Sequence, residues 1–246
     1  MGEDYVQKSL ANLDSHKATG LDVVTSKILK ISAPVISSQL TTIFNRSIES
    51  GVFPSRWKTA RITPVFKSGN HADADNYRPV SISPIISKLL ERHIHKHIYN
   101  FISSHDLVFT AQSGFRPQHS CETALDKLLN TWYQNIEDGF LNGLVLIDFR
   151  KTFDMINLDL LLEKLKLYHF DTLLLKWMDS HLKERSHCVK VKDSLSSPTP
   201  ISHGVPQGSI VEPLLFILFI HDIPLSTISN IDMYADDSTL YARGKS

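Results

Sequence analysis

The sequence has few of the features that would place this chain outside the ordinary globular class. Its 246 residues include only two cysteines, too few for a disulfide framework, and this favours a reducing, intracellular setting. The longest apolar run, Leu214 to Ile220, falls far short of the ~18 residues that a membrane helix needs. The first residues lack the basic and apolar regions of a secretory signal. Hydrophobic residues make up 42% and charged residues 21%, which excludes a disordered tail.

The chain also lacks a net charge, but its two halves differ in sign. Residues 1–120 contain 14 Lys and Arg against nine Asp and Glu, whereas residues 121–246 contain 12 against 17. The window from Pro54 to His97 is the most basic, with eight Lys and Arg against three acidic residues. A basic region beside an acidic one suits a polyanion held on one side and cations held on the other.

Hydrophobic spacing predicts a mixed α and β chain. Residues 1–50 have helical periodicity interrupted by a loop at 17–22, and residues 57–67 and 76–81 alternate as two strands of a hairpin. Gly143 to Phe149 is apolar on both faces, which predicts a central strand buried on both sides. A second hairpin is expected over residues 231–241, with its tip near Ala235 and Asp236. Further helices are predicted at 87–102, 121–137, 157–168, 172–182 and 210–222, and short strands at 187–191 and 202–204.

Three carboxylates mark the candidate chemistry. Asp148 ends the apolar strand, and Asp236 and Asp237 lie at the tip of the second hairpin. A carboxylate among apolar residues is costly unless it is paired or metal-bound, and adjacent carboxylates repel unless a cation lies between them. If the hairpin packs beside the strand, the three side chains form a site for two hard divalent ions. Two such ions can activate an attacking hydroxyl group and stabilise a leaving oxygen. Taken singly, each feature also fits ordinary turn or strand-end chemistry.

Six segments carry a family resemblance. Tyr234-Ala-Asp-Asp237 follows apolar Ile231 and Met233, and the other segments are residues 57–67, 76–79, 112–120, 144–154 and 203–216. In order and spacing they resemble the reverse transcriptase of non-LTR (LINE-type) retrotransposons, nearest to the jockey-like kind. The resemblance implies an α+β right-hand polymerase fold with fingers and a partial palm, the thumb missing.

The resemblance also implies a division of the chain. Residues 1–50 would be a helical extension of the fingers, 51–135 the fingers and 136–246 the palm, with the reverse transcriptase domain covering about 51–246 and incomplete at its C-terminus. On this basis we expect a fragment of a mobile-element reading frame that lacks the thumb and the endonuclease expected upstream in this family.

The same resemblance implies roles for individual residues. Asp148, Asp236 and Asp237 would be the catalytic, metal-binding aspartates, and the main-chain carbonyl of Phe149 would also face a metal ion. The implied cofactor is a pair of Mg²⁺ ions, with Mn²⁺ as a substitute. The resemblance also assigns residues to the substrates. The incoming nucleotide would be contacted by Lys67, Arg78, Phe153, Gln207 and Gly208, with Phe153 as the steric gate against ribonucleotides. The template would be contacted by Arg116.

The activity implied is RNA-directed DNA synthesis, in which dNTPs are added to a primer 3′-OH on an RNA template. The partners would be the RNA template, the DNA primer and dNTPs, with no membrane. One alternative is a catalytically inactive remnant that at most binds nucleic acid. Another is an enzyme of the group II intron or telomerase kind, which shares the palm.

The sequence departs from the family pattern in three places. Glu212 stands where Gly is usual, Thr152 where Ala is usual, and Gly20-Leu-Asp-Val23 replaces Gly-Pro-Asp-Gly. Ser209 and Glu212 have the spacing of a helix capping box, so Glu212 is expected to reach the Ser209 N–H. Glu212 is also expected to place a negative charge near the template and nucleotide.

Overall fold

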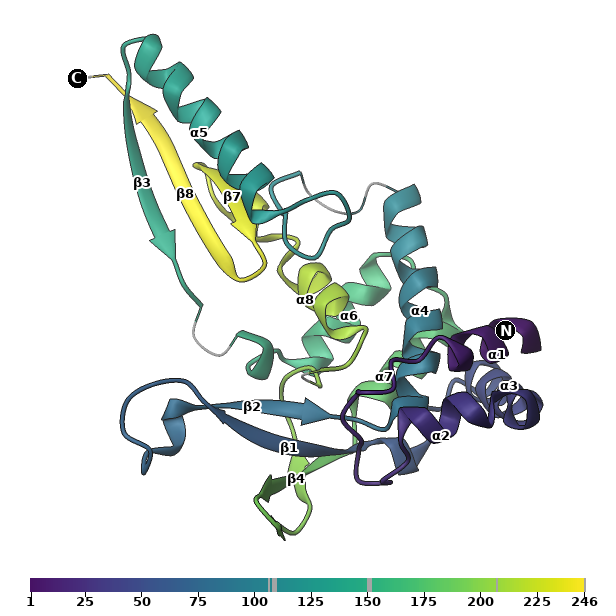
Figure 1. The fold of residues 1–246 in the computed structure, drawn as a ribbon. Helices are drawn as coiled ribbons and strands as arrows, with labels where there is room; N and C mark the ends of the chain where they lie inside the picture. Colours follow the sequence, from purple (N-terminus) through teal and green to yellow (C-terminus); the bar gives the residue numbers. More distant parts are fainter. Residues whose placement is uncertain (106, 108–109, 150–151, 207, 246) are drawn as a thin grey trace.

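The computed structural model describes residues 1–105, 107, 110–149, 152–206 and 208–245. Figure 1 shows two regions, a helical base with a sheet along its lower side and an arm that rises from it. The mixture of helices and strands confirms the α+β class. Within the described ranges, no helix combines the length and apolar character needed to cross a membrane.

The first 50 residues form three helices of the base, α1 (Glu3–Ala11), α2 (Ser26–Ile31) and α3 (Ala33–Ser50). The helical periodicity predicted for this segment is therefore confirmed, with the loop between α1 and α2. Helix α3 ends at Gly51, which has a φ of +65°, a conformation that glycine adopts without steric cost.

The sheet of the base joins distant parts of the chain. The predicted hairpin forms from β1 (Thr59–Phe66) and β2 (Tyr77–Ile82), with Val65 opposite Arg78. Strand β1 also pairs in parallel with β4 (Arg185–Val191). Strand β4 pairs in turn with β5 (Ser194–Leu195) and β6 (Thr199–Ile201), so the strand predicted at 202–204 lies a few residues earlier.

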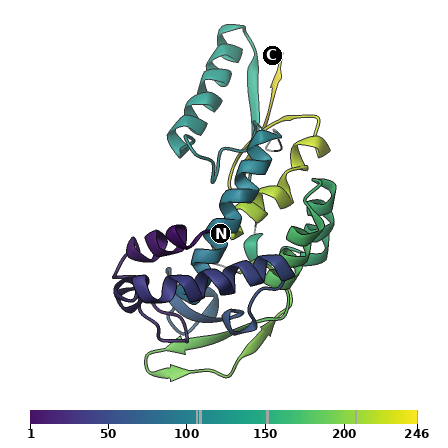
Figure 2. The same cartoon turned by 90° about the vertical axis from the view of Figure 1, so that its right-hand side faces the viewer.

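Four further helices belong to the base: α4 (Ile85–Ser104), α6 (Leu158–Leu167), α7 (Thr172–Leu182) and α8 (Glu212–Ile220). Helix α8 is apolar on every side and nearly fully buried, as its unbroken run of Leu, Phe and Ile predicts. Helix α4 runs from the N-terminal helices toward the arm in both views (Figures 1 and 2). Short 3₁₀ turns lie at Ser55–Trp57, Ala74–Asn76, Thr152–Asp154 and Ile223–Ser226.

The arm consists of α5 (Cys121–Glu137) and an antiparallel sheet with strand order β3-β8-β7. Its strands are β3 (Leu141–Ile147), β7 (Asn230–Tyr234) and β8 (Asp237–Gly244), and β7 and β8 form the hairpin predicted around Ala235 and Asp236. Helix α5 packs on the sheet through Asn135, whose Nδ2 donates to Asn142 Oδ1 at 2.7 Å.

The prediction that the strand before Asp148 is central and buried on both sides is wrong. In the described part of the chain β3 is an edge strand that pairs with β8 alone. Leu144, Val145 and Leu146 are 47%, 59% and 73% exposed. A continuous apolar run indicates that a strand favours burial. It does not indicate whether this chain contains helices or strands that cover both faces of that strand.

Candidate active site

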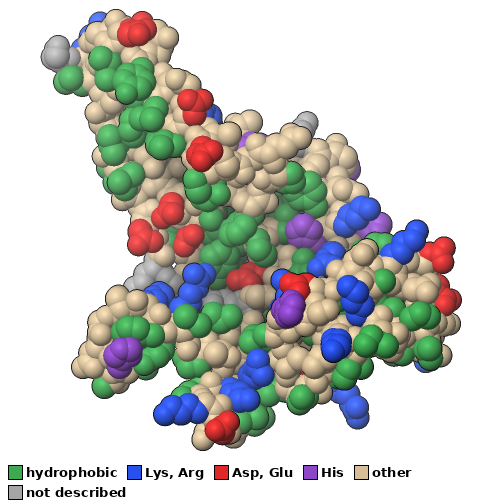
Figure 3. All heavy atoms as spheres, in the orientation of Figure 1, with side chains coloured by type: hydrophobic (Ala, Val, Ile, Leu, Met, Phe, Trp, Pro, Cys, Tyr) green, Lys and Arg blue, Asp and Glu red, His purple; other side chains and the backbone are tan. Residues whose placement is uncertain are grey.

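The three predicted aspartates lie at one end of the arm sheet. Ile147 pairs with Ser238, so Asp148 follows β3 where Asp237 begins β8, and Asp236 lies in the adjoining turn. Figure 3 shows acidic side chains gathered at this end of the arm, opposite the β1–β2 hairpin. Asp148 and Asp237 are exposed and Asp236 is half-buried.

These side chains offer the donor atoms that Mg²⁺ prefers. All three contribute carboxylate oxygens, the ligands of hard divalent cations. Within the described residues, no three His, Cys, Asp or Glu side chains are grouped closely enough to hold a metal ion. The type of donor thus fits the predicted ions, but this structure does not bring Asp148, Asp236 and Asp237 close enough to hold one ion together.

The turn that carries Asp236 is held by Gln112, a residue for which no sequence pattern predicted a role. Ala235 has a φ of +57°, which is strained for a residue with a Cβ atom. The buried Gln112 amide accepts from Ala235 N at 3.0 Å through Oε1 and donates to Ala235 O at 3.2 Å through Nε2. A Cβ atom on Gly114 would lie 2.1 Å from Ala235 N, so only glycine allows this approach.

Thr152 joins the two acidic segments. Its Oγ1 donates to the main-chain carbonyl of Phe149 at 2.8 Å and lies 3.5 Å from Asp236 Oδ2. The carbonyl predicted to face a metal ion thus accepts a hydrogen bond from the side chain that replaces the usual alanine.

Phe153, the predicted steric gate, lies in the 3₁₀ turn that follows Asp148. Its half-buried ring packs against Phe216 of α8, with centroids 4.5 Å apart, and meets Phe115 edge-on at 6.3 Å. The main-chain carbonyl of Phe153 accepts from Val205 N at 3.0 Å. These contacts place the ring between α8 and the loop that precedes α5, while the Phe153 main chain is joined to the loop that precedes α8.

Gly208 of that loop fits tightly against β2. It has a φ of +81°, and a Cβ atom there would lie 2.5 Å from Ser81 O, so the position requires glycine. Gln207, predicted beside it, lies outside the described residues.

Glu212 is not the capping-box partner predicted for it. Its carboxyl group accepts from Gly208 N rather than from Ser209 N. The side chain is buried, and burial raises its pKa to about 8 against the opposing effect of the Gly208 hydrogen bond. Burial therefore favours the neutral form of Glu212, which opposes the negative charge predicted for it.

The predicted cationic residues occupy different surroundings. Lys67 and Arg78 are exposed near the tip of the β1–β2 hairpin, where Lys67 N donates to Asn76 O. Figure 3 shows basic side chains on this hairpin, on the side that faces the acidic end of the arm.

Other cations of the chain are occupied by contacts within the protein. Lys58 is buried with its Nζ 3.5 Å from Glu184 Oε2, so not every cation of the basic window is open to a ligand. Arg116 donates through Nη1 to Gln112 O at 2.8 Å.

The comparisons with known proteins give first the class of protein. The chain belongs to the reverse transcriptase (RNA-dependent DNA polymerase) family, whose model matches residues 66–246. Within that family it is a domain of the non-LTR retrotransposon type, as the following relatives show.

The RNA-directed DNA polymerase from mobile element jockey of Drosophila melanogaster is 31% identical, over 99% of this chain and 27% of that protein. The probable RNA-directed DNA polymerases from transposon BS and transposon X-element of the same species are each 30% identical, over 96% and 98% of this chain and 27% of each relative. The chain thus spans about a quarter of the length of these curated relatives.

Proposed function

We propose that this domain catalyses RNA-directed DNA synthesis, adding dNTPs to a primer 3′-OH on an RNA template. The observation that supports this most is that Asp148, Asp236 and Asp237 occupy one end of the arm sheet, across from an exposed hairpin that carries Lys67 and Arg78. An acidic site opposite a basic one suits a reaction in which a triphosphate and divalent ions meet.

In this proposal Asp148, Asp236 and Asp237 would hold two Mg²⁺ ions, with the Phe149 carbonyl as a further ligand, and Mn²⁺ could replace them. Bound Mg²⁺ supplies the charge that favours the primer alkoxide and the departing pyrophosphate. The Gln112 contacts hold the Asp236 turn in its strained conformation before substrate arrives, so less ordering is needed on binding.

The remaining predicted residues would act on the nucleotide and the template. Arg78 would grip the triphosphate through two donors and Lys67 as a point charge. The Phe153 ring, held by Phe216, would close the space that a ribose 2′-OH needs. Gly208 would let the main chain, and Gln207 beside it, approach the base pair closely, and Arg116 would lie near the template.

Primer extension on an RNA template with purified protein and Mg²⁺ tests the proposal. Asp236→Asn removes a charged ligand without changing side-chain volume, and it should reduce extension by about 100-fold or more, since metal-borne charge stabilisation contributes several kcal/mol. The matched control is Asp193→Asn, an exposed aspartate in the β4–β5 turn, which should extend primers like the parent. Undiminished synthesis by Asp236→Asn would rule out the assignment.

A second candidate, nucleic-acid binding without synthesis, is favoured by the hydrogen bond from Thr152 to the Phe149 carbonyl. If this contact and Glu212 suppress activity, the double change Thr152→Ala and Glu212→Gly should raise extension well above that of the parent. Equal extension by both proteins would argue against this candidate.

A further inference from the structure

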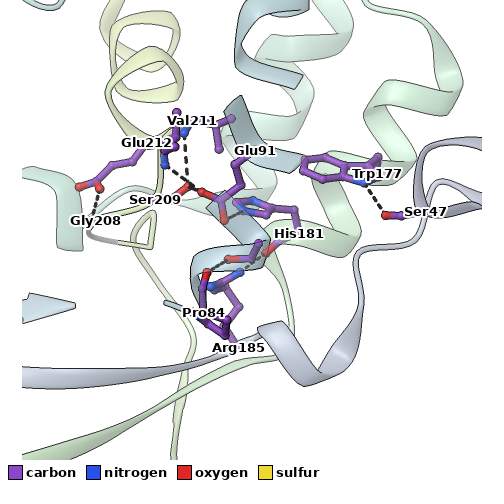
Figure 4. Close-up of polar contacts among 12 residues, drawn as sticks. Ser47, Pro84, Glu91, Trp177, His181, Arg185, Gly208, Ser209, Val211 and Glu212 are labelled. Carbon is purple, nitrogen blue, oxygen red and sulfur yellow. Dashed lines mark hydrogen bonds and ion pairs between the residues drawn. The ribbon is translucent and has the colours of Figure 1, made fainter. Parts of the chain in front are cut away.

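A carboxylate with no predicted role lies at the centre of the base. Glu91 of α4 is fully buried, with a side-chain exposure of 0%. Its Oε2 atom accepts two hydrogen bonds from the loop before α8, from Ser209 Oγ at 2.9 Å and from Ile210 N at 2.9 Å. These partners are 118 and 119 residues away in the chain. Figure 4 shows Glu91 between this loop and helix α7.

The surroundings of Glu91 favour its charged form. Its Oε1 atom lies 3.6 Å from Nε2 of the equally buried His181, and buried Arg185 donates to His181 O at 3.0 Å. Burial alone would raise the pKa of Glu91, but the contacts from His181, Ile210 and Ser209 outweigh it and hold that pKa below its ordinary value. Burial lowers the pKa of His181, and the neighbouring Glu91 opposes that effect. Arg185 adds a buried cation that interacts electrostatically with Glu91. A buried charge of this kind persists only where it is paired and hydrogen-bonded.

Residues 208–211 are held from two sides. On one side Gly208 lies against Ser81 O of β2, where a Cβ atom would approach to 2.5 Å. On the other side Glu91 accepts from Ser209 and Ile210, while Val211 N donates to Ser209 Oγ at 3.3 Å. Gly208 is therefore placed by two contacts together, the packing of its main chain on β2 and the hydrogen bonds of the next two residues to the Glu91 carboxylate.

We propose that Glu91 is a positioning residue for the nucleotide-binding loop, and that its carboxylate places Gly208 by fixing the main chain at Ser209 and Ile210. The inference rests on the proposed function for the role of Gly208 toward the nucleotide. Glu91 itself contacts no substrate in this account; it acts through the loop. A buried residue that merely stabilised the base would have no specific connection to residues 208–211.

Hydrogen exchange of the full chain tests the positioning independently of activity. In Glu91→Gln a weaker acceptor replaces the carboxylate, and the Ile210 amide should exchange about 10-fold faster or more, because a hydrogen bond to a charged group is lost. Ser209→Ala removes one donor, leaves Glu91 in place and should give a smaller change in the same segment. Ser47→Ala is the control, because it removes the buried hydrogen bond from Trp177 Nε1 to Ser47 Oγ and leaves in place the Trp177 ring, which stacks on His181. It should lower the free energy of unfolding of the whole chain. The amides of residues 208–211 should keep the same protection from hydrogen exchange relative to other amides of the base.

Steady-state kinetics give the second readout. Glu91→Gln should raise KM for dNTP about 10-fold with a smaller change in kcat, the pattern expected when a misplaced loop loses binding to the nucleotide. Ser47→Ala should leave KM unchanged. If Glu91→Gln and Ser209→Ala exchange at residues 208–211 like the parent, the positioning role is wrong. If the parent extends no primers but Glu91→Gln still loosens the loop, the proposed function fails and the positioning role stands.

Discussion

The base and the arm contain similar apolar residues but bury them to very different extents. In the base, Leu214, Leu215 and Phe216 of α8 are at most 2% exposed, because α8 packs against α6 and other parts of the base. In the arm, Leu144, Val145 and Leu146 of β3 are 47% to 73% exposed, because α5 covers only part of a three-stranded sheet. The hydrophobicity of a segment therefore does not determine its burial; the neighbouring layers do.

The two regions also hold their functional residues by different means. The arm carries the aspartates on a sheet tied to its surroundings by a few polar contacts, among them Gln112 to Ala235 and the 2.7 Å ion pair of Lys127 and Asp232. The base holds the Gly208 loop through a buried carboxylate and close packing on β2. We therefore expect substitutions in the apolar core of the base to act on overall stability, and those near the Asp236 turn of the arm to act on the site.

The largest expected effect is in the core of the base. Leu215→Ala removes three carbons from a side chain that is 1% exposed, and it should lower the free energy of unfolding by about 2–5 kcal/mol through lost burial and a residual cavity. Chemical denaturation measures the change. A loss below about 1 kcal/mol would show that α8 is not the packed centre of the base.

The next effect depends on pH. The pKa of Glu212 in the folded chain is about 8, above its ordinary value of 4.5, so the folded state binds more protons than the unfolded state between these values. Stability should therefore fall as pH rises from about 5 to 8 and level off above that. Glu212→Gln removes this term, on the order of 3 kcal/mol by the linkage relation.

Denaturation curves of the parent and Glu212→Gln at several pH values measure this difference. Glu122→Gln, at an exposed glutamate in the first turn of α5, is the control and should keep the parental pH dependence. Parallel curves for the parent and Glu212→Gln would contradict the raised pKa.

A smaller effect is expected where the arm meets its support. Gln112→Ala leaves the Ala235 main chain without its partners and should cost about 1–3 kcal/mol. Because the Asp236 turn loses its support, primer extension should fall more steeply than stability. Gln134→Ala, an exposed α5 position, should change neither. Normal extension by Gln112→Ala would show that the turn keeps its shape unaided.

The smallest effect completes the comparison. Leu146→Ala makes the same chemical change as Leu215→Ala, but at a side chain that is 73% exposed. It should alter the free energy of unfolding by less than about 0.5 kcal/mol. A loss close to that of Leu215→Ala would mean that the outer face of β3 is covered in solution.

Local patterns in the sequence predicted most of the elements, because alternation and helical spacing reflect local geometry. The hairpin around Ala235 and Asp236 and helix α5 from Cys121 to Glu137 are examples. Such local patterns do not predict contacts between residues that lie far apart in the sequence. Gln112 meets Ala235 across 123 residues and Glu91 meets Ile210 across 119, and no periodicity connects such pairs. Glu212 had the spacing of a capping box, but the path of the loop gave it Gly208 N instead.

The central claim is that Asp148 acts with Asp236 and Asp237 as one metal site, and binding of Mn²⁺ measured by electron paramagnetic resonance in the presence of dNTP tests it most directly. We predict that Asp148→Asn and Asp236→Asn each weaken Mn²⁺ binding to a similar extent, by about 10-fold or more, as expected when a ligand charge is lost from a shared site. Unchanged Mn²⁺ affinity in Asp148→Asn, alongside a loss in Asp236→Asn, would contradict the account.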